Sequence, residues 1–261
     1  MKKRSIFYRK AEAFFRRFMV YGFSSSLPLY IVTEYPKSGG SWFSQILSDY
    51  LQIPFPRNRF PRFGSCIMHG HYLYFPTMRN VFVVVRDGRD IMVSYYFHCF
   101  FKNDRYNDQL VEKTRKALPF DDYSDIRSNL PRFIEYKFSV RKHPRFTWKE
   151  FVESWQGKKA CFVKYEDLLK DTLQTAGKAI QEVCRMPVEK SRLQSIVEKY
   201  SFKSQTGRAP GSENRKSFLR KGVSGDWKNY FNKESKRIFG YHAGDKLIEL
   251  GYEEDSRWAD N

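Results

Sequence analysis

The stretch Glu34–Leu47, which reads EYPKSGGSWFSQIL, joins two different hydrophobic patterns. Before it, Leu29–Thr33 is a short run that includes two β-branched aliphatic residues. After it, apolar residues from Trp42 onward recur at helical spacing until Pro54. The sequence therefore predicts a strand, a glycine loop and a helix. In such a unit the backbone N–H groups at the start of the helix point toward an anion.

The lysine of this loop precedes the glycines. Four small residues can present successive N–H groups to a phosphate: Ser38, Gly39, Gly40 and Ser41. Lys37 adds a full positive charge at the loop entrance. A Walker A loop would instead read GxxxxGK[ST], with the lysine after the glycines and a hydroxyl on Mg²⁺. We therefore expect a phosphate site of another kind, and a P-loop kinase is the alternative enzyme.

A second basic segment follows the continuous apolar run Val81–Val85, which is typical of a buried parallel strand. Arg86 lies at the end of this strand, where an arginine can bind a phosphate bidentately. Ser94 comes eight residues later, about two helical turns on. The same segment could also be a Walker B strand, in which Asp87 would bind magnesium. The absence of a Walker A loop argues against this interpretation.

A third basic cluster lies in Phe218–Trp227, where Arg220 and Lys221 precede Gly222. Three separate anion-binding candidates suggest a ligand with phosphates at more than one position. A further apolar run, Ala160–Val163, turns at Tyr165. Because ligands of parallel sheets bind beyond the carboxyl ends of the strands, we expect these segments to converge there.

The alternation of strands and helices predicts an α/β fold: a three-layer, P-loop-like domain with a central parallel β-sheet flanked by helices. Ser65–Met68 is a candidate second strand. No long linker interrupts the chain, so we expect one domain over 1–261. Within it, 1–28 is a basic helical segment, and 102–145 is a charged insertion or substrate loop.

The charge balance, with 47 Lys and Arg against 29 Asp and Glu, indicates an anionic partner: nucleic acid, a membrane surface or a small polyanion. A basic polyanion- or membrane-binding protein on the same scaffold is thus the alternative to an enzyme. The N-terminal helix, with Phe14, Phe15 and Phe18, either packs on its own domain or lies on an anionic membrane. The four scattered cysteines fit a reducing compartment.

Four segments, in order, resemble the sulfotransferase superfamily that uses 3′-phosphoadenosine 5′-phosphosulfate (PAPS), in its cytosolic-type branch. YPKSGGSW is similar to the family's 5′-phosphosulfate loop, RDGRDIMVSYY to its 3′-phosphate element, VKYEDL to its YEDL turn, and FLRKGVSGDWKNYF to its RKGxxGDW segment. The resemblance implies transfer of a sulfuryl group from PAPS to an acceptor hydroxyl, or less readily an amine. It also implies release of adenosine 3′,5′-bisphosphate (PAP) with no metal required.

The resemblance also implies roles for single residues. Lys37 would contact the bridging oxygen between phosphate and sulfuryl group, and Ser94 would bind the 3′-phosphate at the catalytic centre. The 5′-phosphate would be held by Ser38, Gly39, Gly40 and Ser41. The adenine would contact Trp42, Tyr165 and Phe202. The 3′-phosphate would also be bound by Arg86, Arg220, Lys221 and Gly222.

The family's base is a histidine that precedes the 3′-phosphate strand. Here the segment Cys66–His71 reads CIMHGH. The resemblance assigns the base to His71, with His69 in place of a family lysine, and leaves His69 as the alternative base. A neutral imidazole suits proton removal from a hydroxyl at neutral pH.

The partners implied are a small-molecule, lipid or saccharide acceptor and no nucleic acid. The expected location is cytoplasmic, with peripheral membrane contact through the basic N-terminus as a variant. A monomer and a homodimer are both compatible with the sequence.

Overall fold

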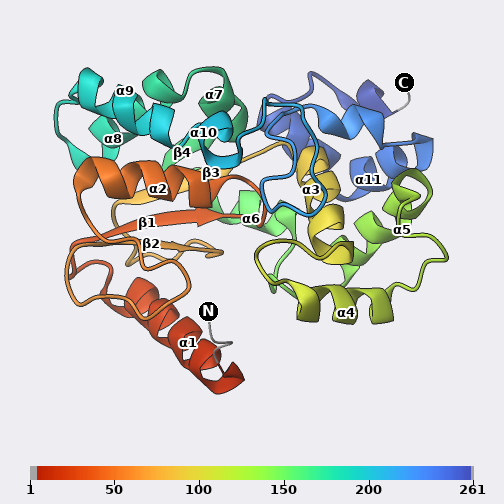
Figure 1. Cartoon of the computed structure of the whole chain (residues 1–261), viewed down its shortest axis with the longest axis horizontal. Coiled ribbons are helices and arrows are strands. Elements are labelled where there is room, and N and C mark those ends of the chain that lie inside the picture. The colour runs from red at the N-terminus through yellow and green to blue at the C-terminus, as the bar shows by residue number, and fades with distance from the viewer. Residues whose placement is uncertain (1–4, 260–261) are drawn as a thin grey trace. The chain divides into compact units, whose positions relative to one another are not determined.

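The computed structural model describes residues 5–259, and its internal contacts divide the chain into two compact units. Unit 1 consists of the described parts of 1–85 and 154–201, and unit 2 of the described parts of 86–153 and 202–261. All the strands belong to unit 1, whereas unit 2 is helical (Figure 1).

Unit 1 contains one four-stranded sheet, and every neighbouring pair of strands in it is parallel. The strands are β1 (Leu29–Glu34), β2 (Cys66–Gly70), β3 (Val81–Val85) and β4 (Cys161–Lys164), in the spatial order β2-β1-β3-β4. All five residues of β3 are buried, as expected for a strand covered on both faces. The predicted central parallel sheet, and the strand, loop and helix around the glycines, are confirmed.

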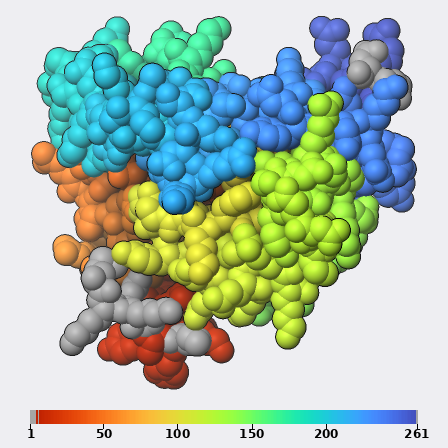
Figure 2. All heavy atoms as spheres, turned by 45° about the vertical axis from the view of Figure 1, so that its right-hand side comes forward, coloured from red at the N-terminus to blue at the C-terminus, as the bar shows by residue number. Residues whose placement is uncertain are grey.

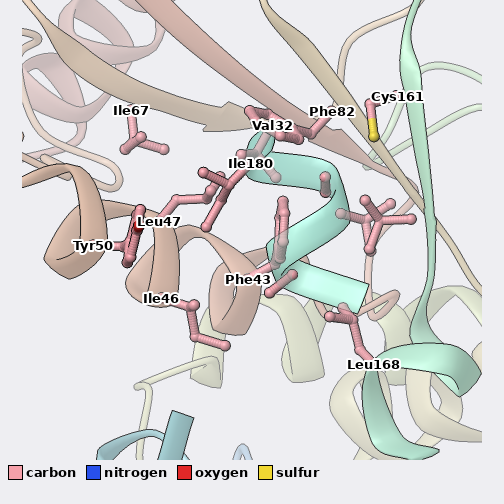
Figure 3. Packing of buried hydrophobic residues seen from close by; sticks show 14 of the residues in the cluster. Val32, Phe43, Ile46, Leu47, Tyr50, Ile67, Phe82, Cys161, Leu168 and Ile180 are labelled. Atoms are coloured by element: carbon pink, nitrogen blue, oxygen red, sulfur yellow. The ribbon is translucent and has the colours of Figure 1, made fainter. Parts of the chain in front are cut away.

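The helices that pack around this sheet bury a common apolar core. They are α2 (Gly40–Leu51), α7 (Tyr165–Lys170), α8 (Thr172–Cys184) and α9 (Lys190–Lys199). Figure 3 shows Phe43 and Leu47 of α2 facing Ile180 of α8 beneath the strands, and none of the three side chains is exposed. Each such side chain contributes about 1.5–3 kcal/mol by its burial, so this core holds the glycine loop at the end of β1 in place.

Helix α1 (Ile6–Phe23) lies within the segment predicted to be helical, and residues 1–4 lie outside the described part of the chain. The Ser5 side chain accepts a hydrogen bond from the N–H of Tyr8 and caps the helix. Met19 and Val20 are buried. The Thr77 hydroxyl donates a hydrogen bond to the carbonyl oxygen of Tyr21 at 2.7 Å, so the helix packs on its own unit. Phe14 and its aromatic neighbours nevertheless remain exposed.

Unit 2 is built from the helices between β3 and β4 and from those that follow α9 in the chain. They are α3 (Gly88–Phe100), α4 (Asp108–Ala117), α5 (Ile126–Ser139), α6 (Trp148–Trp155, whose last two residues belong to unit 1), α10 (Phe202–Thr206) and α11 (Lys233–Glu249), with 3₁₀ turns η1 (Asp226–Asn229) and η2 (Ser256–Ala259). The segment 102–145, expected to be an insertion or a substrate loop, thus contains α4 and α5. Helix α5 buries Phe133 and Ile134. The many charged residues of this segment obscured its helical periodicity in the sequence.

One loop of unit 2, residues 207–222, has no regular structure but is held at several points. The Arg208 guanidinium donates hydrogen bonds to the carbonyl oxygens of Ser212, Leu219 and Arg220. The Asp104 carboxylate accepts a hydrogen bond from the N–H of Phe218 at 2.9 Å. Figure 2 shows this loop (light blue) lying over the yellow segment that precedes α4.

Candidate active site

The glycine loop of unit 1 turns sharply at two residues with positive φ. Lys37 has φ 76° and Gly39 has φ 97°, and Ser38 lies between them. The N–H and Oγ of Ser38 both donate to the carbonyl oxygen of Tyr35, at 3.2 and 2.7 Å, which closes the turn. Within residues 5–259 nothing accepts a hydrogen bond from the N–H groups of Gly39 and Ser41. The start of α2 therefore offers donors to an anion.

Two aromatic residues predicted to contact adenine lie beside this loop. The ring centroids of Trp42 and Tyr165 are 6.2 Å apart, with an interplanar angle of 76°. A Cβ atom at Gly39 would lie 2.5 Å from a ring carbon of Tyr165, so the loop passes directly against that ring. The structure thus brings Trp42 and Tyr165 together with the phosphate loop.

Glu34, the last residue of β1, is a site residue that the sequence reading missed. Its side chain is buried, and Oε2 accepts a hydrogen bond from the Gly40 N–H at 2.7 Å. Its Oε1 lies 2.8 Å from Nε2 of His69. The available signal was an acidic residue at the end of an apolar strand, where a buried charge needs partners.

His71 contacts the same residue through the backbone. Its Nδ1 lies 2.9 Å from the carbonyl oxygen of Glu34. Because a carbonyl oxygen can only accept, Nδ1 carries the proton, and in the neutral ring Nε2 is left with a lone pair. Nε2 of His69, in contrast, donates to a carboxylate. Of the two candidate bases, therefore, only His71 has an Nε2 atom that makes no hydrogen bond to Glu34.

The pKa values of this cluster follow from burial and from the pairing. Burial opposes ionisation of Glu34, but the hydrogen bond from His69, the two histidines and the Gly40 N–H outweigh it and lower the pKa of this carboxyl. Burial lowers the pKa of His71, and the Glu34 carboxylate offsets only part of that effect. At neutral pH the site therefore combines an ionised Glu34 with a neutral His71.

In unit 2 the predicted 3′-phosphate residues are organised by a buried carboxylate, Asp90 of α3. Asp90 accepts hydrogen bonds from the N–H groups of Gly225 and Trp227, at 2.7 and 2.9 Å. It also lies 3.5 Å from the guanidinium of Arg86, which donates to the carbonyl oxygen of Val223 at 3.1 Å. Arg86 is thereby held against the segment that follows Gly222.

Asp87, the residue that a Walker B reading would place on magnesium, has a structural role. Its carboxylate accepts from the N–H of Arg89 at 2.9 Å and caps α3. The same carboxylate pairs with the Arg89 guanidinium at 2.8 Å. Over residues 5–259 the structure contains no group of three or more His, Cys, Asp or Glu side chains arranged to hold a metal ion.

Arg220 and Lys221 share one acidic partner, Asp226. The Lys221 ammonium lies 2.6 Å from its carboxylate, and Arg220 binds the other oxygen. Gly222 has φ 66°, and a Cβ atom there would lie 2.4 Å from the Phe202 ring, so only glycine fits at this position. Unit 2 thus brings Phe202 and Gly222 together.

Ser94, by contrast, lies half-buried on α3, and its hydroxyl makes no hydrogen bond within residues 5–259. Asp90 and Asp226 were missed by the sequence reading because a carboxylate within a basic motif looks like a surface charge.

Two observations bear on whether these residues fit a nucleotide that carries a phosphosulfate. The N–H groups of Gly39 and Ser41 lack partners within the described chain, which favours an anion at the start of α2. The Gly40 N–H already donates a hydrogen bond to the Glu34 carboxylate, so this loop offers an anion one donor fewer than its sequence suggests. In unit 1 the two remaining donors and the rings of Trp42 and Tyr165 beside them fit a phosphate and a base of a nucleotide.

The structure is thus an α/β fold with a central parallel sheet and a glycine loop at the end of β1. A family model described as a sulfotransferase domain matches residues 59–251, which is more than half of the chain. The chain therefore belongs to the sulfotransferase family. This family assignment excludes both alternatives for the class of protein: a P-loop kinase, and a basic polyanion- or membrane-binding protein that is not an enzyme.

Relatives and solved structures agree with this assignment. Sulfotransferase 1E1 of Cavia porcellus is 24% identical over 259 residues, with 81% of this chain and 80% of the relative covered. Sulfotransferase 2A1 of Homo sapiens is 23% identical over 264 residues, with 84% of each chain covered. The crystal structure of mouse sulfotransferase SULT7A1 complexed with PAP matches with a TM-score of 0.66 at 19% identity and covers 92% of this chain and 91% of that one. That of retinol dehydratase with retinol and PAP has a TM-score of 0.57 at 16% identity, covering 88% and 84%. These structures share the fold.

Proposed function

We propose that the protein moves a sulfuryl group from PAPS to a hydroxyl group of a small-molecule acceptor, with Lys37 and His71 at the reacting atoms. The reaction class follows from the family: the protein is a sulfotransferase, PAPS is the donor, and PAP is the product. The observation that carries the assignment of the base is the hydrogen bond from Nδ1 of His71 to the Glu34 carbonyl oxygen.

The glycine loop holds the 5′-phosphate in this proposal. The unpartnered N–H groups of Gly39 and Ser41, with Ser38 and Gly40 beside them, form its anion-binding part. Lys37 lies at the entrance of the loop. Its ammonium stabilises the negative charge that develops on the bridging oxygen as the bond between that oxygen and sulfur breaks.

His71 acts as the general base. Its Nε2 accepts the proton of the acceptor hydroxyl while the acceptor oxygen forms its new bond to sulfur. Burial lowers the pKa of His71, so its base form is present at neutral pH. His69 is held by Glu34 and has a positioning role.

The adenine and the 3′-phosphate complete the donor contacts. In the proposal, Trp42, Tyr165 and Phe202 contact the adenine. The 3′-phosphate is bound by Arg86, Ser94, Arg220, Lys221 and Gly222. The ion pair of Lys221 with Asp226 supports this assignment because it holds the lysine in place before a ligand arrives.

Substitution of Lys37 tests the proposal. We expect Lys37→Ala to lower kcat about 100-fold or more, the usual cost of removing one electrostatic contact to a developing charge, while the far-UV circular dichroism is retained. Transfer of labelled sulfate from PAPS to a panel of phenols, sterols and saccharides measures the rate. Lys170→Ala, an exposed lysine on α7, is the matched control. An unchanged rate in Lys37→Ala would remove this lysine from the mechanism.

We also propose that the protein acts in a reducing compartment, the cytoplasm, and contacts a membrane surface through α1. None of the four cysteines, all within residues 5–259, forms a disulfide, as is usual for proteins of reducing compartments. Within residues 5–259 no helix has both the length and the apolar character to cross a bilayer. On α1, however, Phe7, Phe14 and Phe18 are 79%, 64% and 51% exposed and recur at helical spacing.

The charges around α1 favour an anionic lipid surface as the partner. Residues 1–23 include seven lysines and arginines and one acidic residue. A helix with exposed aromatic residues beside cations binds at the interface of such a membrane. Sedimentation with phosphatidylcholine vesicles, with and without phosphatidylserine, tests this contact. Phe14→Ser with Phe18→Ser should abolish binding, and Tyr241→Ser, on the exposed side of α11, should retain it. Equal binding by all three proteins would refute it.

A further inference from the structure

Lys137, near the end of α5, is a buried lysine in unit 2 with no acidic partner. Its side chain is 5% exposed, yet within residues 5–259 no carboxylate lies within ion-pair distance of its ammonium. The ammonium donates to the carbonyl oxygen of His143 at 3.3 Å and lies 4.1 Å from the ring centre of Tyr95. A carbonyl and an aromatic ring stabilise a cation, but neither neutralises its charge.

The burial of this cation is unfavourable by itself. Transfer of an ammonium group out of water is costly unless a counter-charge compensates for it. Burial lowers the pKa of Lys137 to about 8, so the group is still largely protonated at neutral pH. Within residues 5–259, therefore, no negatively charged group compensates for the charge of the protonated Lys137.

A cavity of about 310 Å³ lies beside Lys137, between α3, α4 and α5. Its lining is apolar on several sides, through Leu110, Ala117 and Phe133. Three further lysines line it, Lys113, Lys116 and Lys142, whereas no acidic residue of the described chain does so. The cavity is thus both positively charged and partly apolar.

From this arrangement we infer a second ligand site in unit 2, which binds an organic anion: its charged group contacts Lys137, and its apolar body lies against Leu110 and Phe133. None of the residues assigned above to the donor or to the base lines this cavity. The ligand class is an amphiphilic carboxylate or sulfate monoester. A sulfate monoester is also the chemical class of product that a sulfotransferase releases.

Calorimetric titration of the full-length protein tests the site with three probes of the same chain length: octanoate, octyl sulfate and the neutral octanamide. We expect saturable binding of at least one anion and at least tenfold weaker binding of octanamide. Preference for octyl sulfate would assign the site to sulfate esters, and preference for octanoate would assign it to carboxylates. PAP added at saturation should leave the anion affinity unchanged.

Lys137→Met keeps an unbranched side chain, shorter by one heavy atom, and removes its charge. We expect this variant to bind the preferred anion at least tenfold more weakly, whereas Lys233→Met, an exposed lysine on α11, should bind it as the native protein does. If Lys137→Met fails to fold, the midpoint of thermal unfolding of the native protein, measured with each probe, takes its place. The anion should raise this midpoint and octanamide should not. Absence of saturable anion binding, or equal binding by Lys137→Met, would overturn the inference.

Discussion

The Glu34 carboxylate lies 2.8 Å from Nε2 of His69, and the backbone carbonyl of the same glutamate lies 2.9 Å from Nδ1 of His71. One residue at the end of β1 therefore fixes both histidines. Its second carboxylate oxygen accepts a hydrogen bond from the Gly40 N–H at 2.7 Å, so the glycine loop and both histidines are held by one residue. In the proposed mechanism this arrangement positions the loop and His71 before a substrate binds.

The two histidines should respond differently to substitution. His71→Ala removes the proposed base and should lower kcat by about 10²–10⁴-fold, the usual contribution of general base catalysis. His69→Ala removes only a partner of Glu34, so its effect on kcat should be smaller. Steady-state rates at saturating PAPS measure both. A larger loss in His69→Ala than in His71→Ala would transfer the role of base to His69.

Glu34→Gln should change the pH profile as well as the rate. The Glu34 carboxylate raises the pKa of His71 and so offsets part of the effect of burial. Without that charge the pKa of His71 falls further, the base stays unprotonated to lower pH, and the acid limb of kcat moves to lower pH.

The profile of kcat against pH, for the native protein and for Glu34→Gln, measures this shift. Glu182→Gln, exposed on α8, is the matched control and should keep the native profile. An acid limb that stays in place, or moves to higher pH, in Glu34→Gln would show that the carboxylate does not act through His71.

Gly39→Ala should damage the loop for two separable reasons. The backbone at φ 97° is strained for alanine, and the added Cβ atom would lie 2.5 Å from the Tyr165 ring. Gly157 also has positive φ, 66°, but open space surrounds it, so Gly157→Ala reports strain alone, at about 1–2 kcal/mol. Gly39→Ala should lower the free energy of unfolding more than Gly157→Ala and should weaken PAP binding. If both variants lose the same free energy of unfolding and Gly39→Ala still binds PAP, the Tyr165 ring and the loop must move to accept the added Cβ atom with little loss of stability.

The sheet was predictable because each of its strands contains a short apolar run. Val81–Val85 is buried at every position, and a continuous apolar run of this length predicts a strand that is covered on both faces. Helix α5 was not predicted, because its charged residues and Pro131 obscure the helical period that Phe133 and Ile134 follow. The proline lies inside the helix and has no N–H to donate to the carbonyl oxygen of Arg127, which instead accepts a hydrogen bond from the Asn232 side chain at 3.0 Å.

The site was predictable only as far as its motifs. Lys37 and the glycines stand in a contiguous segment whose chemistry can be read directly. Glu34 and Asp90 act through backbone N–H groups that are brought to them by folding, and residue type alone does not show such contacts. The sequence therefore indicates the candidate groups for a ligand, and the structure adds Glu34 and Asp90, which hold those groups in place.

Calorimetric titration with PAP, and separately with ADP plus Mg²⁺, tests the central claim most directly. ADP lacks the 3′-phosphate that Arg86, Ser94 and Arg220 are proposed to bind. The account predicts PAP binding with a Kd of about 1 μM without added metal, about −8 kcal/mol, and ADP binding at least 100-fold weaker. Equal affinities for PAP and ADP, or PAP binding unchanged by Arg86→Ala, would contradict it.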